Sequence, residues 1–333
     1  MSQHARAKPP SASRSFTKTD GESRDTPESR ASFMADVLDG LGRTQKSLPP
    51  KYFYDKKGCQ LFIEITHQPE YTVTRTEASL LREHVEGIGA LLDSPSTLIE
   101  LGGVSPGRTE TMLEALVSLR KYVPVDVAPD SLAMARTLAH RVRPDIVVDS
   151  VMADFASGLD LPVLTNDPDT LVFFPGSSVS NLEPHDVVTF LDHLARSLGN
   201  GRLLIGVDRK KPKEVLEAAY NDRNGATAAF NLNLLTRINR ELGFNFDTSK
   251  FAHYARYVAE RGRIEMHLVS LAEQAVSLGR RRFDFRRGES IHTENSYKYG
   301  VDEFTRLARS AGWSSVATWT DPEELFALHL LRV

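Results

Sequence analysis

The sequence predicts an α/β protein with a doubly wound sheet of mostly parallel strands. Short apolar runs alternate with helical patterns between about residues 97 and 220 of the 333-residue chain, which is the order that a parallel sheet requires. A glycine-rich turn follows the first of these runs, and acidic residues follow the next two. Ligands of such sheets bind at the carboxyl ends of the strands. We therefore expect a ligand site at that edge of the sheet.

Composition excludes several classes of function. The net charge of −3 gives no reason to expect nucleic-acid binding. Cys59 is the only cysteine, which excludes a disulfide framework and a thiolate metal cluster. His185 and His193 stand eight residues apart rather than four, and we expect no bound metal. No apolar run is long enough to cross a bilayer. We expect a cytoplasmic monomer that contacts neither nucleic acid nor membrane.

The chain begins with a polar segment. Residues 1–31 have almost no large apolar side chain, so they cannot bury enough surface to offset the entropy of ordering. We expect a disordered tail there and a short amphipathic helix over 32–41. Aromatic residues and prolines crowd 46–81, including Tyr54 and Tyr71, whose hydroxyl groups need partners when they are buried. A segment that only caps the core is the simpler interpretation.

A long helix is expected over residues 74–92. Thr74 and Glu77 have the spacing of a capping box at its start. A buried strand follows at 97–101, then Gly102, Gly103 and Gly107, and then a helix from Thr109. Such a turn brings backbone N–H groups close to a nucleotide-like ligand. The glycines lack the G-x-G-x-x-G spacing, which disfavours an NAD-dependent oxidoreductase, and a purely structural turn also fits them.

Two acidic residues at strand ends favour a nucleoside ligand. Asp126 ends the second strand, 122–127, where an acid accepts hydrogen bonds from ribose hydroxyls. Capping of the next helix is the alternative role, for which Asp130 is better placed. The third strand, 146–151, leads to Asp154 and Phe155, which suit the amine and the ring of adenine. A turn aspartate and a core phenylalanine fit these two positions equally well.

The remaining strands bring further residues to the same edge. The fourth strand, 170–174, precedes a small polar loop with Gly176 and Asn181, whose backbone can approach a ligand closely. A helix over 184–198 and a fifth strand over 202–207 complete the alternation. Gly102, Asp126, Asp154 and Gly176 therefore all follow the carboxyl ends of strands. This convergence is the strongest purely physical argument for a binding site.

The pattern changes after residue 211. We expect a helix over 226–242, paired strands over 252–259 and 263–272, a β segment over 290–297, a helix over 301–311 and a final strand over 326–333. The expected division is a first domain of residues 76–210 and 301–333. Residues 32–75 and 211–300 would form a second, α+β domain that holds the substrate.

Several motifs resemble one family over about residues 40–333. KSLPPKYFYD, PEYTVTRTEA, FFPGSSVSN, RIEMHL and TENSYK are similar to the S-adenosylmethionine-dependent histidine Nα-methyltransferases of ergothioneine biosynthesis. The resemblance implies a class I methyltransferase domain with a Rossmann-like sheet and an inserted substrate-binding domain. It implies S-adenosyl-L-methionine as the cofactor and L-histidine as the small-molecule substrate, trimethylated on its α-amino group to hercynine.

The resemblance also assigns residues to the site. The implied cofactor site comprises Tyr54, Gly102, Arg108, Asp126, Asp154 and Phe155. The implied substrate site comprises Tyr71, Gly176, Asn181, Tyr220, Met266, Glu294 and Ser296. A carboxylate and a hydroxyl can serve the two ring nitrogens of an imidazole. Tyr54 and Tyr71 would orient the reactants, and no dedicated general base is evident. From the residues alone, Met266 also fits plain core, Glu294 a solvated strand and Asn181 a helix cap.

Three positions depart from the family pattern. Gly103-Val104 replaces a serine–glycine pair, Arg108 replaces a lysine, and Ser180 replaces a glycine beside Asn181. Arginine and lysine are not interchangeable, and Ser180 could shift the loop that holds the substrate carboxylate. Three alternatives stay open. They are a methyltransferase for tryptophan, tyrosine or a histidine derivative, a non-catalytic cofactor-binding protein, and the disfavoured oxidoreductase.

Overall fold

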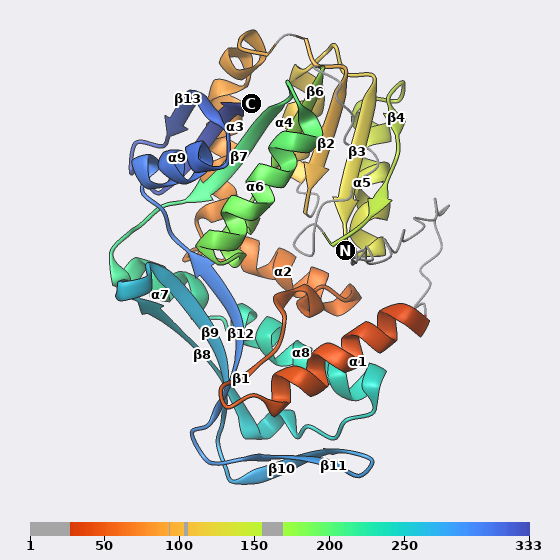
Figure 1. Ribbon diagram of the computed structural model, residues 1–333, viewed down its shortest axis with the longest axis vertical. Coiled ribbons are helices and arrows are strands. Elements are labelled where there is room, and N and C mark those ends of the chain that lie inside the picture. The colour runs from red at the N-terminus through yellow and green to blue at the C-terminus, as the bar shows by residue number, and fades with distance from the viewer. Residues whose placement is uncertain (1–26, 93, 103–105, 155–168) are drawn as a thin grey trace, which may run out of the picture.

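The computed structural model describes residues 27–92, 94–102, 106–154 and 169–333 (Figure 1). Most of the expected tail, Gly103, Val104 and Phe155 lie outside these residues. The first described helix, α1 (Pro27–Gly42), overlaps the expected tail, so the boundary at residue 31 was wrong. Its first turn is polar, and the apolar pattern starts only at Phe33, but Pro27 suits the first turn of a helix. No helix within the described ranges is long and apolar enough to cross a membrane.

The larger sheet confirms the predicted α/β fold. Its strands lie in the order β13 (Ser314–Thr320), β14 (Phe326–Arg332), β7 (Arg202–Asp208), β6 (Thr170–Phe174), β2 (Thr97–Leu101), β3 (Lys121–Asp126) and β4 (Val147–Val148), and β5 (Val151–Met152) also pairs with β3. The strands from β7 to β4 are parallel, and β14 runs antiparallel to both of its neighbours. The third strand, expected over residues 146–151, is divided into two short strands, β4 and β5.

Helices cover both faces of this sheet (Figure 1). Leu81 of α3 (Val73–Ala90) and Met112 of α4 (Pro106–Ala115) share one core cluster, which also takes in α5 (Pro129–Val142). Leu191 of α6 (Pro184–Leu198) and Phe304 of α9 (Val301–Ser310) belong to the other. Amphipathic helices on two faces bury both sides of a parallel sheet, so the doubly wound arrangement is also confirmed.

A second, four-stranded sheet stands beside the first. Its order is β1 (Lys46–Ser47), β12 (Ser290–Tyr297), β9 (Arg263–Ser270) and β8 (Phe251–Val258). Helices α7 (Lys213–Tyr220) and α8 (Ala226–Leu242) pack on it, and α2 (Lys56–Thr66) packs on α8. A hairpin of β10 (Gln274–Leu278) and β11 (Arg281–Phe285) extends from it (Figure 1). Strand β12 leads from this sheet back toward α9, so it connects the two halves.

Two expected helix caps were wrong. Helix α3 begins after Thr72, and Glu77 is fully buried against Arg108 rather than folded back on the helix start. At α5 the N-cap residue is Ala128, and Asp130 lies in the first turn. The Asp126 carboxylate instead accepts hydrogen bonds from the Ala128 N–H at 2.8 Å and the Ser131 hydroxyl at 3.0 Å. A tertiary contact decides where the Glu77 carboxylate points, whereas the Asp126 carboxylate is held by residues at the start of α5.

Candidate active site

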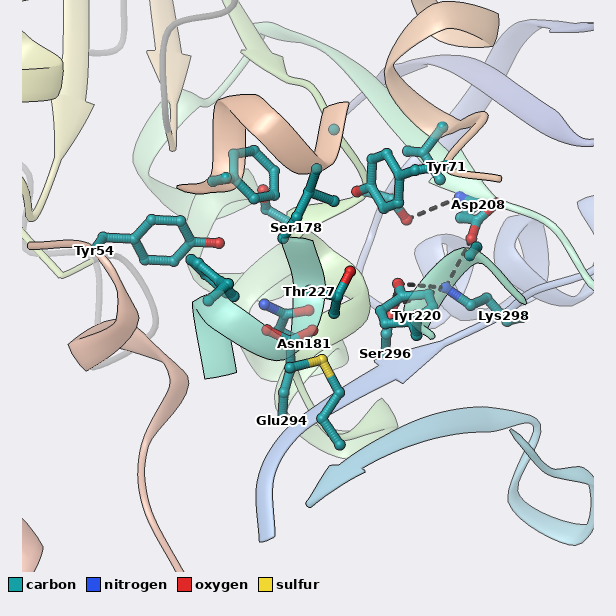
Figure 2. A pocket seen from close by; sticks show the side chains of 18 residues that line it. Tyr54, Tyr71, Ser178, Asn181, Asp208, Tyr220, Thr227, Glu294, Ser296 and Lys298 are labelled. Carbon is teal, nitrogen blue, oxygen red and sulfur yellow. Dashed lines mark hydrogen bonds and ion pairs between the residues drawn. The ribbon is translucent and has the colours of Figure 1, made fainter. Parts of the chain in front are cut away.

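A cavity lies between the two sheets, beside α2 and α8, and it contains every residue expected to bind substrate (Figure 2). These residues come from distant parts of the chain: Tyr71 from just before α3, Gly176 and Asn181 from the loop after β6, Tyr220 from α7, Met266 from β9, and Glu294 and Ser296 from β12. The sequence interpretation did not include Phe62, Asp208, Thr227, Phe230 and Lys298, which also line it. Its wall combines aromatic rings with a few convergent polar groups, as small-molecule sites do.

Strand β12 presents a polar row to the cavity. Side chains two residues apart share one face of a strand, and Glu294, Ser296 and Lys298 all line the cavity. The register of β12 shifts between His292 and Glu294, where it pairs with β9. Glu294 lies opposite Met266 in that pairing, so Met266 is both a core residue and part of the cavity wall.

The surroundings of Glu294 favour its neutral form. Burial raises the pKa of the carboxyl group to about 7, and the positive charge of Lys298 partly opposes this shift. The Glu294 carboxyl group therefore changes charge near neutral pH. When ionised it is an acceptor for an N–H group in the cavity.

A hydrogen-bonded cluster lies at one end of the cavity (Figure 2). The Tyr220 hydroxyl donates to Ser296 Oγ at 2.7 Å. The Lys298 ammonium donates to the same Ser296 oxygen at 2.8 Å and to the Tyr220 hydroxyl oxygen at 3.0 Å. It also pairs with Asp208 at 2.7 Å, and Asp208 pairs with Lys211. Burial and the nearby Asp208 charge raise the pKa of Tyr220, so its hydroxyl keeps its proton.

Glu77 and Arg108, which do not line the cavity, hold the loop at Gly176 in place. Gly176 has φ +76°, and its N–H donates to the Glu77 carboxylate at 2.8 Å. Glu77 also pairs with Arg108, and a Cβ at Gly176 would lie 3.0 Å from Arg108 Nη1. Only glycine meets both the positive φ and the close approach without strain. Arg108 therefore lies behind the loop and does not line the cavity. The contact with a cofactor expected for Arg108 stays a prediction.

The serine that departs from the family pattern adds a contact to this loop. Ser180 is fully buried, and its hydroxyl is hydrogen-bonded to the hydroxyl of Ser177. Ser177 Oγ accepts in turn from the Asp208 N–H at 2.8 Å. The loop that carries Gly176 and Asn181 is thereby tied to the end of β7.

Tyr54 and Tyr71 lie in the cavity wall among other aromatic rings. The Tyr71 ring meets that of Tyr220 at 6.4 Å between centroids, and Tyr54 meets Phe62 and Phe230 edge-on. Burial raises the pKa of both phenols well above the usual value. Their hydroxyl groups are therefore neutral hydrogen-bonding groups and not bases at neutral pH.

A wider groove opens on the other side of Tyr54. Its wall includes Lys51, Tyr54, Val127, Ala128, Met152 and Asp154. Asp154 follows β5 and pairs with Lys51 at 3.3 Å. The Gly102 N–H donates to the Val125 carbonyl at 2.9 Å, and Gly102 has φ +75°. Residues that follow β3 and β5, among them Asp154, line this groove, whereas Gly102 and Asp126 are not among its lining residues. The cofactor contacts expected for Gly102 and Asp126 stay predictions.

The groove suits an elongated nucleoside ligand that ends at Tyr54. Tyr54 borders both the groove and the cavity, so a group bound in one would meet a group bound in the other there. Asp154 supplies a carboxylate to the groove. A dinucleotide is disfavoured, because its pyrophosphate needs N–H groups at a G-x-G-x-x-G turn, and this sequence lacks that spacing.

The sequence offered one signal for a residue that the interpretation missed. Lys298 stands one residue past the end of β12 and continues the two-residue spacing of Glu294 and Ser296, so the strand period points to it. Glu77 and Phe230 carry no such local signal, because their partners lie far away in the chain.

Comparison with known proteins identifies the family. The model of the family "Histidine-specific methyltransferase, SAM-dependent" matches residues 33–333. The histidine N-alpha-methyltransferase of Mycolicibacterium smegmatis is 39% identical over 302 residues, 89% of this chain and 93% of that protein. Ergothioneine biosynthesis protein 1 of Neurospora crassa is 30% identical over 86% of this chain and 33% of that protein.

One more distant relative has a different substrate in its name. The 4-dimethylallyltryptophan N-methyltransferase of Aspergillus fumigatus is 25% identical over 89% of this chain and 92% of that protein. The match of the family model covers nearly the whole folded part and agrees with the motifs and with the cavity they form. The chain belongs to the family of S-adenosylmethionine-dependent, histidine-specific methyltransferases.

Proposed function

We propose that this protein transfers methyl groups from S-adenosyl-L-methionine to the α-amino group of L-histidine, three times in succession, and so makes hercynine for ergothioneine biosynthesis. One observation carries the proposal: Glu294 and Ser296, adjacent on one face of β12, line the same cavity as Asn181 and Tyr71. A carboxylate and a hydroxyl at this spacing match the two ring nitrogens of an imidazole. Neither indole nor phenol offers that pair.

The remaining cavity residues have roles that fit an amino acid. Asn181 and Tyr220 can bind the α-carboxylate, and Tyr71 with the Gly176 loop can orient the amine. Met266 packs against the ring. The elements around the four-stranded sheet, residues 32–75 and 211–300, would then be the substrate-binding domain, and residues 76–210 and 301–333 the cofactor-binding domain.

The cofactor would lie in the wider groove, with its reactive end at Tyr54. Bound there, it supplies an electrophilic methyl group on a sulfonium. Asp126 would hold the ribose hydroxyls and Asp154, with Phe155, the adenine, while Gly102 lets the backbone approach. Arg108 would act on the site through Gly176. Alignment of the amine with the methyl group supplies most of the acceleration, because the sulfonium is intrinsically reactive.

The substrate amine must lose a proton before each transfer. A free amine is mostly protonated at neutral pH. Burial keeps Tyr54 and Tyr71 neutral, so they would orient the amine, which loses its proton to water or to a nearby group. After the third transfer the nitrogen has no proton to donate, and the product loses that hydrogen bond.

Mass spectrometry of L-histidine incubated with the protein and S-adenosylmethionine tests the proposal. The expected product carries three added methyl groups. L-tryptophan and L-tyrosine in competition test the alternative substrates suggested by the tryptophan-derived substrate of one relative. Methylation of tryptophan in preference to histidine, or no product from any amino acid, would overturn the proposal. We also propose that the protein acts as a cytoplasmic monomer, which light scattering and fractionation test.

A further inference from the structure

Lys298 is a buried cation whose donors are all used. Its side chain is 1% exposed. An ammonium group has three N–H donors and no acceptor. Here one donor serves Asp208 Oδ2 at 2.7 Å, one Ser296 Oγ at 2.8 Å and one the Tyr220 hydroxyl oxygen at 3.0 Å. Figure 2 shows Lys298 at the end of the cavity, behind the two hydroxyl groups.

This arrangement makes both hydroxyl oxygens acceptors from Lys298. Because Lys298 can only donate, the oxygens of Tyr220 and Ser296 each accept from it. Only one proton can lie in the 2.7 Å bond between the two oxygens. The other hydroxyl proton must point elsewhere, and both residues line the cavity. With a ligand that brings two acceptors, both protons can turn toward it while Lys298 continues to hold the oxygens.

We propose that Lys298 is a positioning residue that holds the hydroxyl groups of Tyr220 and Ser296 as hydrogen-bond donors toward the substrate, so that the cavity selects a carboxylate and an unprotonated ring nitrogen. The inference rests on the proposed function and deepens it. It assigns the ring tautomer: the nitrogen that faces Ser296 lacks a proton, and the nitrogen that faces Glu294 carries one. An indole ring has a single nitrogen, which is an N–H donor. It would face the Ser296 hydroxyl, also a donor, so no hydrogen bond could form there.

The chain contains a matched control for this role. Lys211 pairs with the same Asp208 carboxylate and is similarly buried, with a side chain 5% exposed. It does not line the cavity, and Asp208 is its hydrogen-bond partner in the structure. Removing either lysine leaves Asp208 with the other. A purely structural role for Lys298 predicts that Lys298→Met and Lys211→Met have the same effect.

Calorimetric titration of L-histidine into the protein with bound S-adenosylhomocysteine tests the inference. Lys298→Met is expected to weaken L-histidine binding by about 10- to 100-fold, since hydrogen bonds from charged groups have such effects, and to leave S-adenosylhomocysteine affinity within about threefold. Lys211→Met is expected to leave both affinities near wild type. Equal affinity of wild type and Lys298→Met for L-histidine, or an equal loss in Lys211→Met, would overturn the inference.

Two further variants address folding and coupling. Lys298→Gln keeps two N–H donors without the charge, and we expect a smaller loss than for Lys298→Met. In the Ser296→Ala background, Lys298→Met should cost less than it does in wild type, because residues that act together are not additive. The same loss of affinity from Lys298→Met in both backgrounds would contradict the proposed positioning role of Lys298. A wild-type protein that binds no L-histidine would instead contradict the proposed function, so the two failures are distinguishable.

Discussion

The Glu77 carboxylate and the Arg108 guanidinium form an ion pair in the interior, and the same carboxylate accepts the N–H of Gly176. Glu77 is fully buried and Arg108 is 5% exposed. The pair joins α3 and α4 behind the loop that borders the substrate cavity. A buried pair contributes little to stability as a whole, but loss of one partner leaves an uncompensated charge.

We therefore expect Glu77→Leu to lower the free energy of unfolding by about 3–5 kcal/mol. Urea denaturation measures the change. The double variant Glu77→Leu with Arg108→Met should recover most of the loss, because neither charge then stays buried alone. Unchanged stability in Glu77→Leu would contradict the pairing.

The pKa of Glu294, raised to about 7 by burial, predicts a pH dependence of stability. In the unfolded chain this carboxyl group ionises near pH 4.5. Between pH 4.5 and 7 the unfolded state has lost more protons, so stability falls as the pH rises through this window. Glu294→Gln removes that contribution. Its stability relative to wild type should rise by about 2 kcal/mol between pH 4 and pH 8, less than the full pKa difference implies because the group borders a cavity.

Urea denaturation of both proteins at several pH values checks this dependence. Burial also raises the pKa of Glu100 to about 7. Because Glu100 is present in both wild type and Glu294→Gln, its contribution cancels in the difference between them. A constant difference in stability across this range would show that Glu294 does not titrate there. The same variant should lose L-histidine affinity at pH 8, where the wild-type carboxylate is ionised.

Tyr54 and Tyr71 should respond differently to loss of the hydroxyl group. Tyr54 borders both the groove and the cavity, while Tyr71 borders only the cavity. Tyr71→Phe is expected to raise the KM for L-histidine by about fivefold, as loss of one hydrogen bond does, with no change for S-adenosylmethionine. Tyr54→Phe should affect the kinetics with both. Steady-state kinetics with each substrate varied in turn measures these effects. The same changes in KM for both substrates in the two variants would contradict the assignment.

Glu183 connects the loop after β6 to the second sheet. Its carboxylate accepts from Arg263 at 2.8 Å and from Asn295 at 3.0 Å, and also from the Tyr297 hydroxyl. Because Asn181 lies two residues earlier, Glu183→Ala should weaken L-histidine binding as well as lower the free energy of unfolding by about 1–2 kcal/mol. Asp192→Asn, which breaks the exposed pair with Arg196, is the control and should change stability by less than about 0.5 kcal/mol. Equal effects of the two variants would contradict the connection.

Elements with strong local signals were predictable from the sequence. Helices α6 and α8 have the expected bounds, because each has an amphipathic pattern and a glycine directly after its last residue. Elements without such signals were missed. The outer strand β13 is mostly exposed and lacks a clear alternation, and α2 stands in a segment crowded with aromatic residues and prolines.

By itself the sequence determined the doubly wound sheet and the family, and it predicted the seven residues proposed to bind substrate. These follow from short-range periodicity and from motifs that are contiguous in the chain. Only the tertiary structure decided that Glu77 holds Gly176, that Arg108 lies behind the loop, and that Lys298 joins Tyr220 to Ser296 and Asp208. Apart from the contact between Lys298 and Ser296, which are two residues apart, these contacts join elements distant in sequence. A buried charge takes its partner from whatever the fold brings near, so local spacing carries no information about that choice.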